Sequence, residues 1–207
     1  MTDGSVRRDF AVVSYTPGNF SLISRLEVHG AFIRDVSVSA FDAASQAVGS
    51  ITLILVPSSI EAGSGGGAIN TVNSPLFREN LFSFEVAGQP LQHVAAVSSL
   101  HVSFGKIADM PMGNYRQYLP GQPVFDSLQL EVASGSTSAT YLQTWVSSVA
   151  GGNPRRDGAI TLLNQASSPF GHISLFEMIP ITFHPFSTSP NRRTLFLEVG
   201  RFEVSVP

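Results

Sequence analysis

The feature that most constrains the fold is a series of short segments in which apolar and polar residues alternate, separated by glycine, proline and asparagine. In residues 24–41 the alternation is clearest near the end, where Val36 and Val38 fall on one face and Ser37 and Ser39 on the other. Similar segments are residues 81–88, 98–106, 125–133, 159–165, 172–186 and 193–206. Many short strands joined by turn-forming residues predict an antiparallel β-barrel or sandwich.

Only one segment, "SATYLQTWVSSVAGG" (138–152), has helical spacing. The apolar positions that repeat at steps of three and four are Leu142, Val146 and Val149. We expect Ser138 or Thr140 to cap the start of this helix and the glycine pair after it, Gly151 and Gly152, to end it. The predicted fold is therefore mostly β, with one flanking α-helix at about residues 139–150.

The composition is poor in charge. Charged residues make up 13% of the chain and apolar residues 43%, whereas about a quarter of the residues of an average soluble domain are charged. The net charge of -3 provides no general positive field that could hold nucleic acid. Little of the surface is committed to solvation, which indicates that much of it faces protein.

No segment reads as a membrane span or a secretory leader. The longest apolar run, "ITLILVP" (51–57), is far shorter than the roughly 20 residues that a bilayer requires, and we predict a buried strand there. The first ten residues lack the apolar core of a signal peptide, and the absence of cysteine excludes disulfides and thiolate metal sites. Synthesis in the bacterial cytoplasm is the simpler expectation.

Two segments are predicted as loops. Residues 57–75 contain "AGSGGGA" and are expected to form a mobile loop or linker; a phosphate-binding loop is the alternative, but no lysine and no helix follow. Residues 106–125 form the second long loop. Its apolar and aromatic residues, which tend to cover a surface, are Met110, Met112, Tyr115, Tyr118 and Leu119. A neighbouring subunit is one surface that they can cover.

The residues that usually carry catalysis form no recognisable pattern. The histidines, which lack the spacing of a zinc site, are His29, His93, His101, His172 and His184. No nucleophile elbow is present, and glutamates in segments such as "LEV" and "FEM" fit the solvated face of a strand. The sequence therefore predicts no enzyme, no metal and no cofactor.

Arg155, Arg156 and Asp157 follow the predicted helix. A positive charge near a helix C-terminus is favourable, which accounts for one arginine at most. Two arginines and an aspartate can also form bidentate ion pairs with carboxylates on a neighbouring element or subunit. A nucleic-acid contact at this point alone would be weak, because no wider basic stripe accompanies it.

The order of these pieces resembles the tail tube proteins of contractile-tailed phages and of phage-derived contractile injection systems, over about residues 82–206. The matching pieces are "FSFEVAGQPLQHVAAVSSLHVSFGK" (82–106), "YLPGQPVFDSLQLEV" (118–132), "YLQTWVSSVAGG" (141–152), "RRDGAITLLNQASSPFGHISLFEMIPITF" (155–183) and "RRTLFLEVGRFEV" (192–204). Glu131 and Val132 depart from the family pattern, which has a basic pair there. Several weak motifs in the same order are more specific than any one of them.

The resemblance implies a self-assembling structural protein. Members of that family form six-membered rings through sheet continuation, and the rings stack into a hollow tube, inside a sheath and on a baseplate, through which DNA or effectors pass. The expected location is a virion tail or an extracellular injection particle. By position in the family, residues 106–125 would reach the adjacent ring, and Arg155, Arg156 and Asp157 would lie at a subunit boundary.

Residues 1–80 lie outside this resemblance and are predicted to be a strand-rich extension with a glycine-rich loop at 58–75, followed by a tube-like domain at 81–207. The extension leaves two specialised versions open: a tube initiator or baseplate ring that joins the tube to the hub, and the tube of a tail with no sheath. A different class also remains, a β-sandwich that binds carbohydrate with Tyr115, Tyr118 and Phe125 as its platform.

Overall fold

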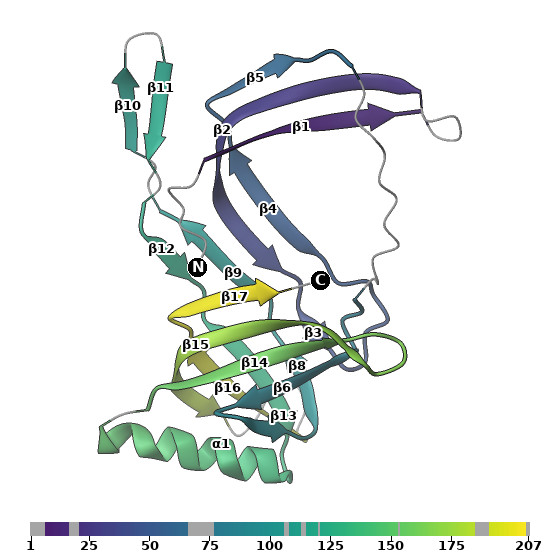
Figure 1. Cartoon of the computed structure of the whole chain (residues 1–207). Helices are drawn as coiled ribbons and strands as arrows, with labels where there is room; N and C mark the ends of the chain where they lie inside the picture. Colours follow the sequence, from purple (N-terminus) through teal and green to yellow (C-terminus); the bar gives the residue numbers. More distant parts are fainter. Residues whose placement is uncertain are drawn as a thin grey trace.

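The computed structural model describes residues 7–16, 21–65, 77–105, 108–112, 115–119, 121–152, 154–184 and 191–205, with the backbone alone at 108–112 and 115–119. No helix in these ranges is both long and apolar enough to cross a membrane. Strands dominate and pair antiparallel throughout the described sheets. The mostly β fold with one flanking helix is thereby confirmed (Figure 1).

The elements follow one another in a long run of strands that a single helix interrupts. The first strands are β1 (Arg8–Tyr15), β2 (Leu22–Val38), β3 (Phe41–Asp42), β4 (Ile51–Val56), β5 (Ser59–Ala62), β6 (Phe82–Val86), β7 (Gln89–Leu91), β8 (Val94–Val97) and β9 (Leu100–Phe104). After them come β10 (Ala108–Met112), β11 (Tyr115–Leu119), β12 (Pro123–Phe125), β13 (Leu128–Ala133), helix α1 (Thr137–Ser147) and the 3-10 turn η1 (Ser148–Gly151). The chain ends in β14 (Arg156–Leu163), β15 (Pro169–His184), β16 (Arg192–Glu198) and β17 (Arg201–Ser205).

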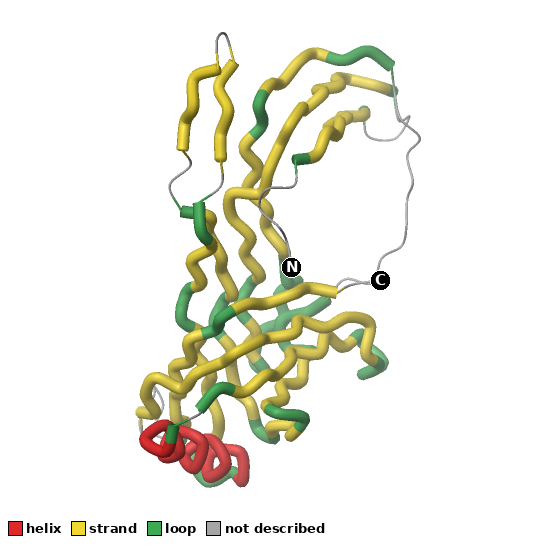
Figure 2. Tube along the Cα trace, turned by 60° about the vertical axis from the view of Figure 1, so that its left-hand side comes forward, coloured by secondary structure: helices red, strands yellow, loops and turns green. Residues whose placement is uncertain are grey.

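The larger sheet, here called the core sheet, has nine strands in the order β3-β8-β13-β16-β15-β14-β6-β7, with β17 added to β15. Alternate residues of its strands point inward, as the burial of every second residue in β13 and β14 shows. Together with α1 they enclose one hydrophobic core that includes Leu130, Ile160 and Trp145, all without accessible surface. Helix α1 lies across the end of this sheet (Figures 1 and 2).

The cap of α1 differs from the prediction. Ser136 has extended backbone angles, and its hydroxyl accepts a hydrogen bond from the backbone N–H of Ala139 at 3.1 Å, so Ser136 caps the helix. Ser138 is buried instead, where its hydroxyl accepts from the N–H of Gln92 at 2.7 Å. The prediction of Ser138 or Thr140 was wrong because the helix begins at Thr137, before the predicted start at about residue 139. The predicted glycine stop is present, since Gly152 ends η1 with φ +115°.

The second sheet, here called the N-terminal sheet, has the order β1-β2-β9-β12, with β4 and β5 paired to the other edge of β2. The long strand β2 bends where Gly30 takes φ +57° and where the register with β4 shifts between Ile33 and Asp35. The sheet thereby curves over β17 (Figures 1 and 2). Strand β2 pairs with β9, and β3 pairs with β8. Each sheet therefore combines described strands from before residue 80 with strands from after it.

Residues 51–57 form the predicted strand, but the prediction that it is buried was wrong. The side chain positions of β4 are exposed or half-buried, and Leu53 keeps 52% of its accessible surface. An apolar run is buried only where another layer of structure covers it closely, and β17 leaves an open apolar groove between itself and Ile51 and Leu53 of β4.

The two predicted loops contain strands. Within the first, β5 pairs with β2, and residues 66–76 lie outside the described residues. Within the second, β10 and β11 form a two-stranded hairpin of their own and β12 pairs with β9. A loop of 106–125 was therefore the wrong prediction; its turn-forming residues separate short strands rather than prevent them.

Candidate functional site

Arg156 begins β14 and fastens α1 to the core sheet. Its guanidinium lies 5.1 Å from the ring centre of Tyr141 and 5.3 Å from that of Trp145, and it donates a hydrogen bond to the Tyr141 hydroxyl at 2.6 Å. The indole N–H of Trp145 donates to the carbonyl of Pro154 at 2.5 Å. Both contacts join the helix to the segment that leads into β14, so Arg156 has a role within the chain.

Arg155 and Asp157 both contact Glu177, which lies in β15 with φ +54°. Arg155 forms an ion pair with the Glu177 carboxylate, and Asp157 accepts a hydrogen bond from the backbone N–H of Glu177 at 2.8 Å. The backbone carbonyl of Asp157 also accepts from the N–H of Ala87 at 2.7 Å, and Ala87 has φ +52°. Asp157 thus stabilises two backbone conformations that residues other than glycine rarely adopt.

The sequence predicted ion pairs between this arginine pair and a neighbouring element or subunit, and the carboxylate partner of Arg155 comes from a neighbouring element. The pair is exposed, with 55% and 61% of the two side chains accessible, so its contribution to stability is at most about 1 kcal/mol. The role of Arg155, Arg156 and Asp157 at a subunit boundary stays a prediction.

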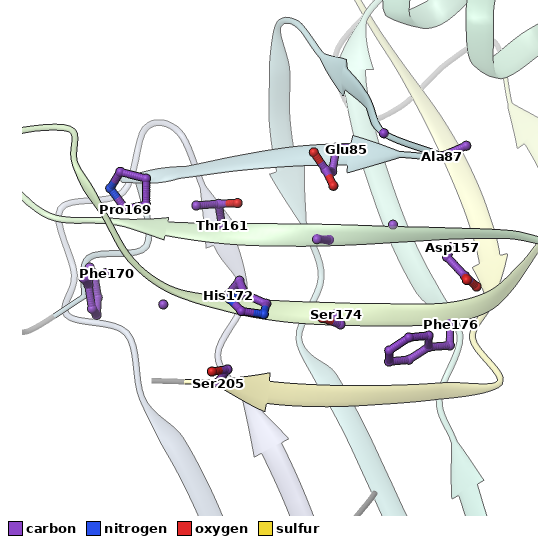
Figure 3. Close-up of a pocket in the computed structure, with 14 residues that line it drawn as sticks. Glu85, Ala87, Asp157, Thr161, Pro169, Phe170, His172, Ser174, Phe176 and Ser205 are labelled. Atoms are coloured by element: carbon purple, nitrogen blue, oxygen red, sulfur yellow. The ribbon is translucent and has the colours of Figure 1, made fainter. Parts of the chain in front are cut away.

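A shallow trough of about 940 Å³ begins beside Asp157 and runs over the outer face of β6, β14, β15 and β17. Figure 3 shows its floor, with Thr161 and Ser174 between Phe170 and Phe176 at the two ends. The floor also includes Gly158, Ala159 and Gly171, so that small side chains make the surface concave.

Gly158 is required by the packing beneath the trough. A Cβ atom at this position would lie 2.3 Å from the backbone carbonyl oxygen of Glu85 and 2.6 Å from the Met178 methyl group. Strand β6 therefore approaches β14 so closely that only glycine fits. The trough is a consequence of how the core sheet is built, and its open, shallow form suits a protein surface better than a small molecule.

A group of polar side chains around His101 lies on the outward face of the N-terminal sheet. His101 Nδ1 is 3.0 Å from the Asp126 carboxylate and His101 Nε2 is 3.8 Å from that of Asp35, which also pairs with Arg34 at 2.6 Å. Among the described residues no group of three or more histidine, aspartate or glutamate side chains is arranged to hold a metal ion. The cluster is a network of surface ion pairs, as expected for polar groups on a solvated sheet face.

The remaining predicted interface residues share one hairpin. Met110 and Met112 lie in β10, and Tyr115, Tyr118 and Leu119 lie in β11, with Met112 opposite Tyr115 and Asp109 opposite Tyr118. Their side chains lie outside the described part of the structure. Figure 1 shows the hairpin at the end of the molecule opposite to α1, so the two groups of predicted residues belong to separate surfaces.

Sequence reasoning missed the trough and an exposed apolar face on the N-terminal sheet. The trough combines β14, β15 and β17 with β6, which lies far from them in the sequence. The apolar face had a signal in the apolar residues of 10–15 and 51–56, but apolar content does not reveal whether a face is covered.

Comparison with known proteins identifies similar folds. No protein-family model matches the sequence, and no curated protein sequence matches it. A sheath/tube terminator of the extracellular contractile injection system PVC, in the extended state, is 20% identical over 60% of this chain and 93% of its own, with a TM-score of 0.50. A chain of the PVC sheath-tube complex is 18% identical over 61% of this chain and 88% of its own, with a TM-score of 0.48.

A chain from the baseplate of the anti-feeding prophage is 18% identical over 68% of this chain and 98% of its own, with a TM-score of 0.46. At such identities a likeness concerns the fold alone. The segment that aligns with the terminator accounts for most of its length and 60% of this chain. Over that segment the chain is similar in fold to a chain of the PVC sheath/tube terminator.

Proposed function

We propose that the protein is a structural subunit of a phage tail or contractile injection system tube, which assembles into hexameric rings that stack into a hollow conduit for DNA or effectors. The observation that carries this proposal is the fold that 60% of this chain shares with a chain of the PVC sheath/tube terminator. Sheath and baseplate proteins would be its partners, in a virion tail or an extracellular particle assembled in the bacterial cytoplasm. No catalytic role is included.

Exposed apolar side chains support assembly. Val12, Leu53 and Ile60 keep 49%, 52% and 57% of their accessible surface. Exposed apolar surface of this kind is typical of protein-binding regions. A chain with 13% charged residues has few groups to keep such surface in water.

Edge strands provide a way for copies to join. Within the described sheets, β17 pairs only with β15, β7 only with β6, and β12 only with β9. Exposed edges invite pairing with another chain, and a closed ring of copies satisfies them without open-ended aggregation. Sheet continuation around a ring is therefore consistent with the hydrogen bonding that the chain leaves open.

The proposed contacts between copies use both groups of predicted residues. The hairpin residues Met110, Met112, Tyr115, Tyr118 and Leu119 contact another copy at one end of the molecule. Arg155, Arg156 and Asp157 do so at the other end, next to the trough, because the ion pair of Arg155 is exposed there. Each copy thus has two contact regions far apart, as ring formation and stacking require.

The experiment is negative-stain electron microscopy of the purified full-length protein, together with size-exclusion chromatography and light scattering. Rings with a central hole, or stacked tubes, are expected. The variant Arg155→Glu is expected to abolish rings while its melting temperature stays close to that of the wild type, because its ion pair is exposed. Thr140→Glu on the exposed face of α1 is the control.

Two results would each contradict one part of what is proposed. A wild-type protein that stays monomeric at high concentration would exclude the tube. Rings from Arg155→Glu as abundant as those from the wild type would exclude the boundary role of the arginine pair and leave the tube proposal intact.

A tube initiator or baseplate ring is the second candidate. The observation that favours it is that the similarity to the sheath/tube terminator covers 60% of this chain and 93% of the other, so that this chain carries additional structure. Single rings that do not stack at any concentration would favour this candidate, whereas long tubes would exclude it. The carbohydrate-binding alternative loses part of its platform, since Phe125 packs edge-on against Phe202 with ring centres 5.9 Å apart.

A further inference from the structure

The N-terminal sheet has two faces of different chemistry. Directly opposite residues share a face, so the registers place Val12 beside Leu26 and Phe10 beside Val28. On the other edge of β2, Ile60 lies opposite Val28. These five apolar side chains form one continuous patch, in which Ile60 keeps 57% and Val12 49% of its accessible surface.

The same face continues past the bend in β2. There Val36 lies opposite Leu53 on β4 and Val102 on β9, and Val102 in turn lies opposite Phe125 on β12. The register shift between Ile33 and Asp35 keeps the apolar residues on this side of the sheet. We call the whole surface, from Phe10 to Phe125, the apolar face.

The opposite face carries the charged groups. Arg25 and Glu27 form an ion pair at 3.1 Å on β2, and His101 pairs with Asp126 at 3.0 Å near the other end of the sheet. This face is suited to water. The sheet is thus amphipathic, and a sheet of this kind is stable when a second layer covers its apolar side.

A second layer covers only part of the apolar face. Strand β17 stands across its lower part, where Phe202 and Val204 line an apolar groove of about 470 Å³ together with Leu53 and Phe125. In the upper part Val28 keeps only 7% of its accessible surface, whereas Val12, Leu26 and Ile60 beside it remain exposed among the described residues. An exposed apolar patch bordered by charge is typical of a protein-binding surface.

The hairpin β10–β11 lacks support in the same way. It pairs with no other strand of the described sheets. An isolated two-stranded hairpin is at best marginally stable in water, so it requires packing against another surface. Its sequence, "ADMPM" and "YRQYL", is rich in methionine and tyrosine, which are enriched at interfaces. Figures 1 and 2 show the hairpin at the same end of the molecule as the upper part of the N-terminal sheet.

We propose that the apolar face of one copy binds the β10–β11 hairpin of a second copy, which supplies the missing layer. The proposal rests on the proposed function, because it requires self-association. A second copy fits better than an unrelated partner, since the same chain carries both the uncovered face and the unsupported hairpin.

Cross-linking tests which surfaces meet, and the chain has no natural cysteine to interfere. One preparation carries Leu26→Cys on the apolar face. A second, with a different affinity tag, carries Arg116→Cys or Gln117→Cys, adjacent positions of β11 that lie opposite Pro111 and Met110 of β10. The two are mixed, dissociated and reassembled, and then treated with a short bismaleimide. Glu27→Cys, which lies next to Leu26 on the charged face, replaces Leu26→Cys in the control.

A cross-linked dimer that carries both tags is expected with Leu26→Cys and one of the two hairpin variants, and not with Glu27→Cys. Assembled rings or tubes without that product, or with cross-links only between two Leu26→Cys chains, would overturn this proposal while the tube function stands. A preparation that never associates would overturn both, and the size measurement identifies that case.

A matched pair of lysine substitutions tests the same contact without cross-linking. Ile60→Lys places a charge on the apolar face, and Ser59→Lys adds the same charge to the opposite face of β5. We expect Ile60→Lys to raise the concentration needed for assembly at least about tenfold, as for a residue at the centre of an interface, and Ser59→Lys to change it less than about twofold. Circular dichroism and melting verify that both fold. Equal assembly of the two variants would overturn the proposal.

Discussion

The core sheet and the N-terminal sheet are built from the same kinds of strands, yet they bury their apolar residues to very different degrees. Leu130 in β13 has no accessible surface, whereas Leu53 in β4 keeps 52% of its own. Both leucines belong to strands paired in antiparallel sheets. The difference is that the core sheet folds onto itself and α1, while the N-terminal sheet has β17 over one part only.

The comparison teaches that strand formation and burial are separate properties. Backbone hydrogen bonds and alternation are satisfied in both sheets, because a strand needs only neighbours beside it. Burial needs a further layer, which the chain provides for one sheet and leaves incomplete for the other. An amphipathic sheet with an incomplete second layer is a natural site for assembly, and its apolar residues then contribute to association rather than to the stability of the single chain.

The largest effect is expected from one substitution made in both sheets. Leu130→Ala should lower the free energy of unfolding by about 2–5 kcal/mol, because it leaves a cavity in a closed core. Leu53→Ala should lower it by less than about 1 kcal/mol in the monomer, because half of the side chain is already in water. Urea denaturation at a concentration where the protein is monomeric measures both. Equal losses would mean that the N-terminal sheet has a closed core of its own.

The next effect concerns the close approach of β6 and β14. Gly158→Ala should cost about 2–3 kcal/mol, because the new methyl group meets the backbone carbonyl of Glu85, which cannot move without the strand. Gly135→Ala, where a Cβ atom meets nothing within 4 Å, is the control and should leave stability within about 0.5 kcal/mol. Thermal unfolding of both variants measures these changes in stability. A Gly158→Ala variant as stable as the wild type would show that β6 and β14 can move apart to admit the methyl group.

A smaller effect is expected at the start of α1, the helix that closes the core sheet. Ser136→Ala removes the acceptor of the Ala139 N–H and should cost about 1 kcal/mol. Ser147→Ala, near the exposed end of the helix, should cost less than about 0.5 kcal/mol, since it removes only a hydrogen bond to the Gln143 carbonyl. Chemical denaturation measures both, and the reverse order would mean that the helix is capped elsewhere.

The smallest effect is a pH dependence of β1, at the edge of the N-terminal sheet. The backbone N–H of Gly30, which donates to Asp9 at 2.7 Å, and the nearby His29 lower the pKa of the Asp9 carboxyl below its ordinary value of 3.8. The stabilisation is therefore complete above that ordinary value and disappears as the pH falls through the lower pKa of the folded state.

Amide hydrogen exchange of β1 tests this titration. Protection in the wild type should decrease below about pH 4, and Asp9→Asn should lose that part of the decrease while the core sheet is unaffected in both. Identical acid profiles for the two proteins would show that Asp9 does not control the pairing of β1 with β2.

The sequence supported most of the fold and less of the candidate site. Alternation identified the strands of the core sheet, and the spacing of Leu142 and its neighbours identified the helix, because these patterns are local. The sequence-based prediction placed the helix cap wrongly. It also missed the hairpin within 106–125, because the turn-forming residues of this segment led to the prediction of a loop. For Arg155, Arg156 and Asp157 the sequence predicted ion pairs but could not name Glu177 or the rings of Tyr141 and Trp145, which come from other elements.

By itself, the sequence determined the strands that alternate clearly, such as β13 and β14, with their apolar sides, and that few charges are available to solvate the surface. These properties depend on residue type and on spacing along the chain. Only the tertiary structure decided that β4 stays exposed, that Gly158 must be a glycine, and that among the described residues the upper part of the apolar face keeps exposed side chains. Those outcomes depend on which segments, distant in sequence, pack against one another, and packing is a property of the whole chain rather than of any stretch of it.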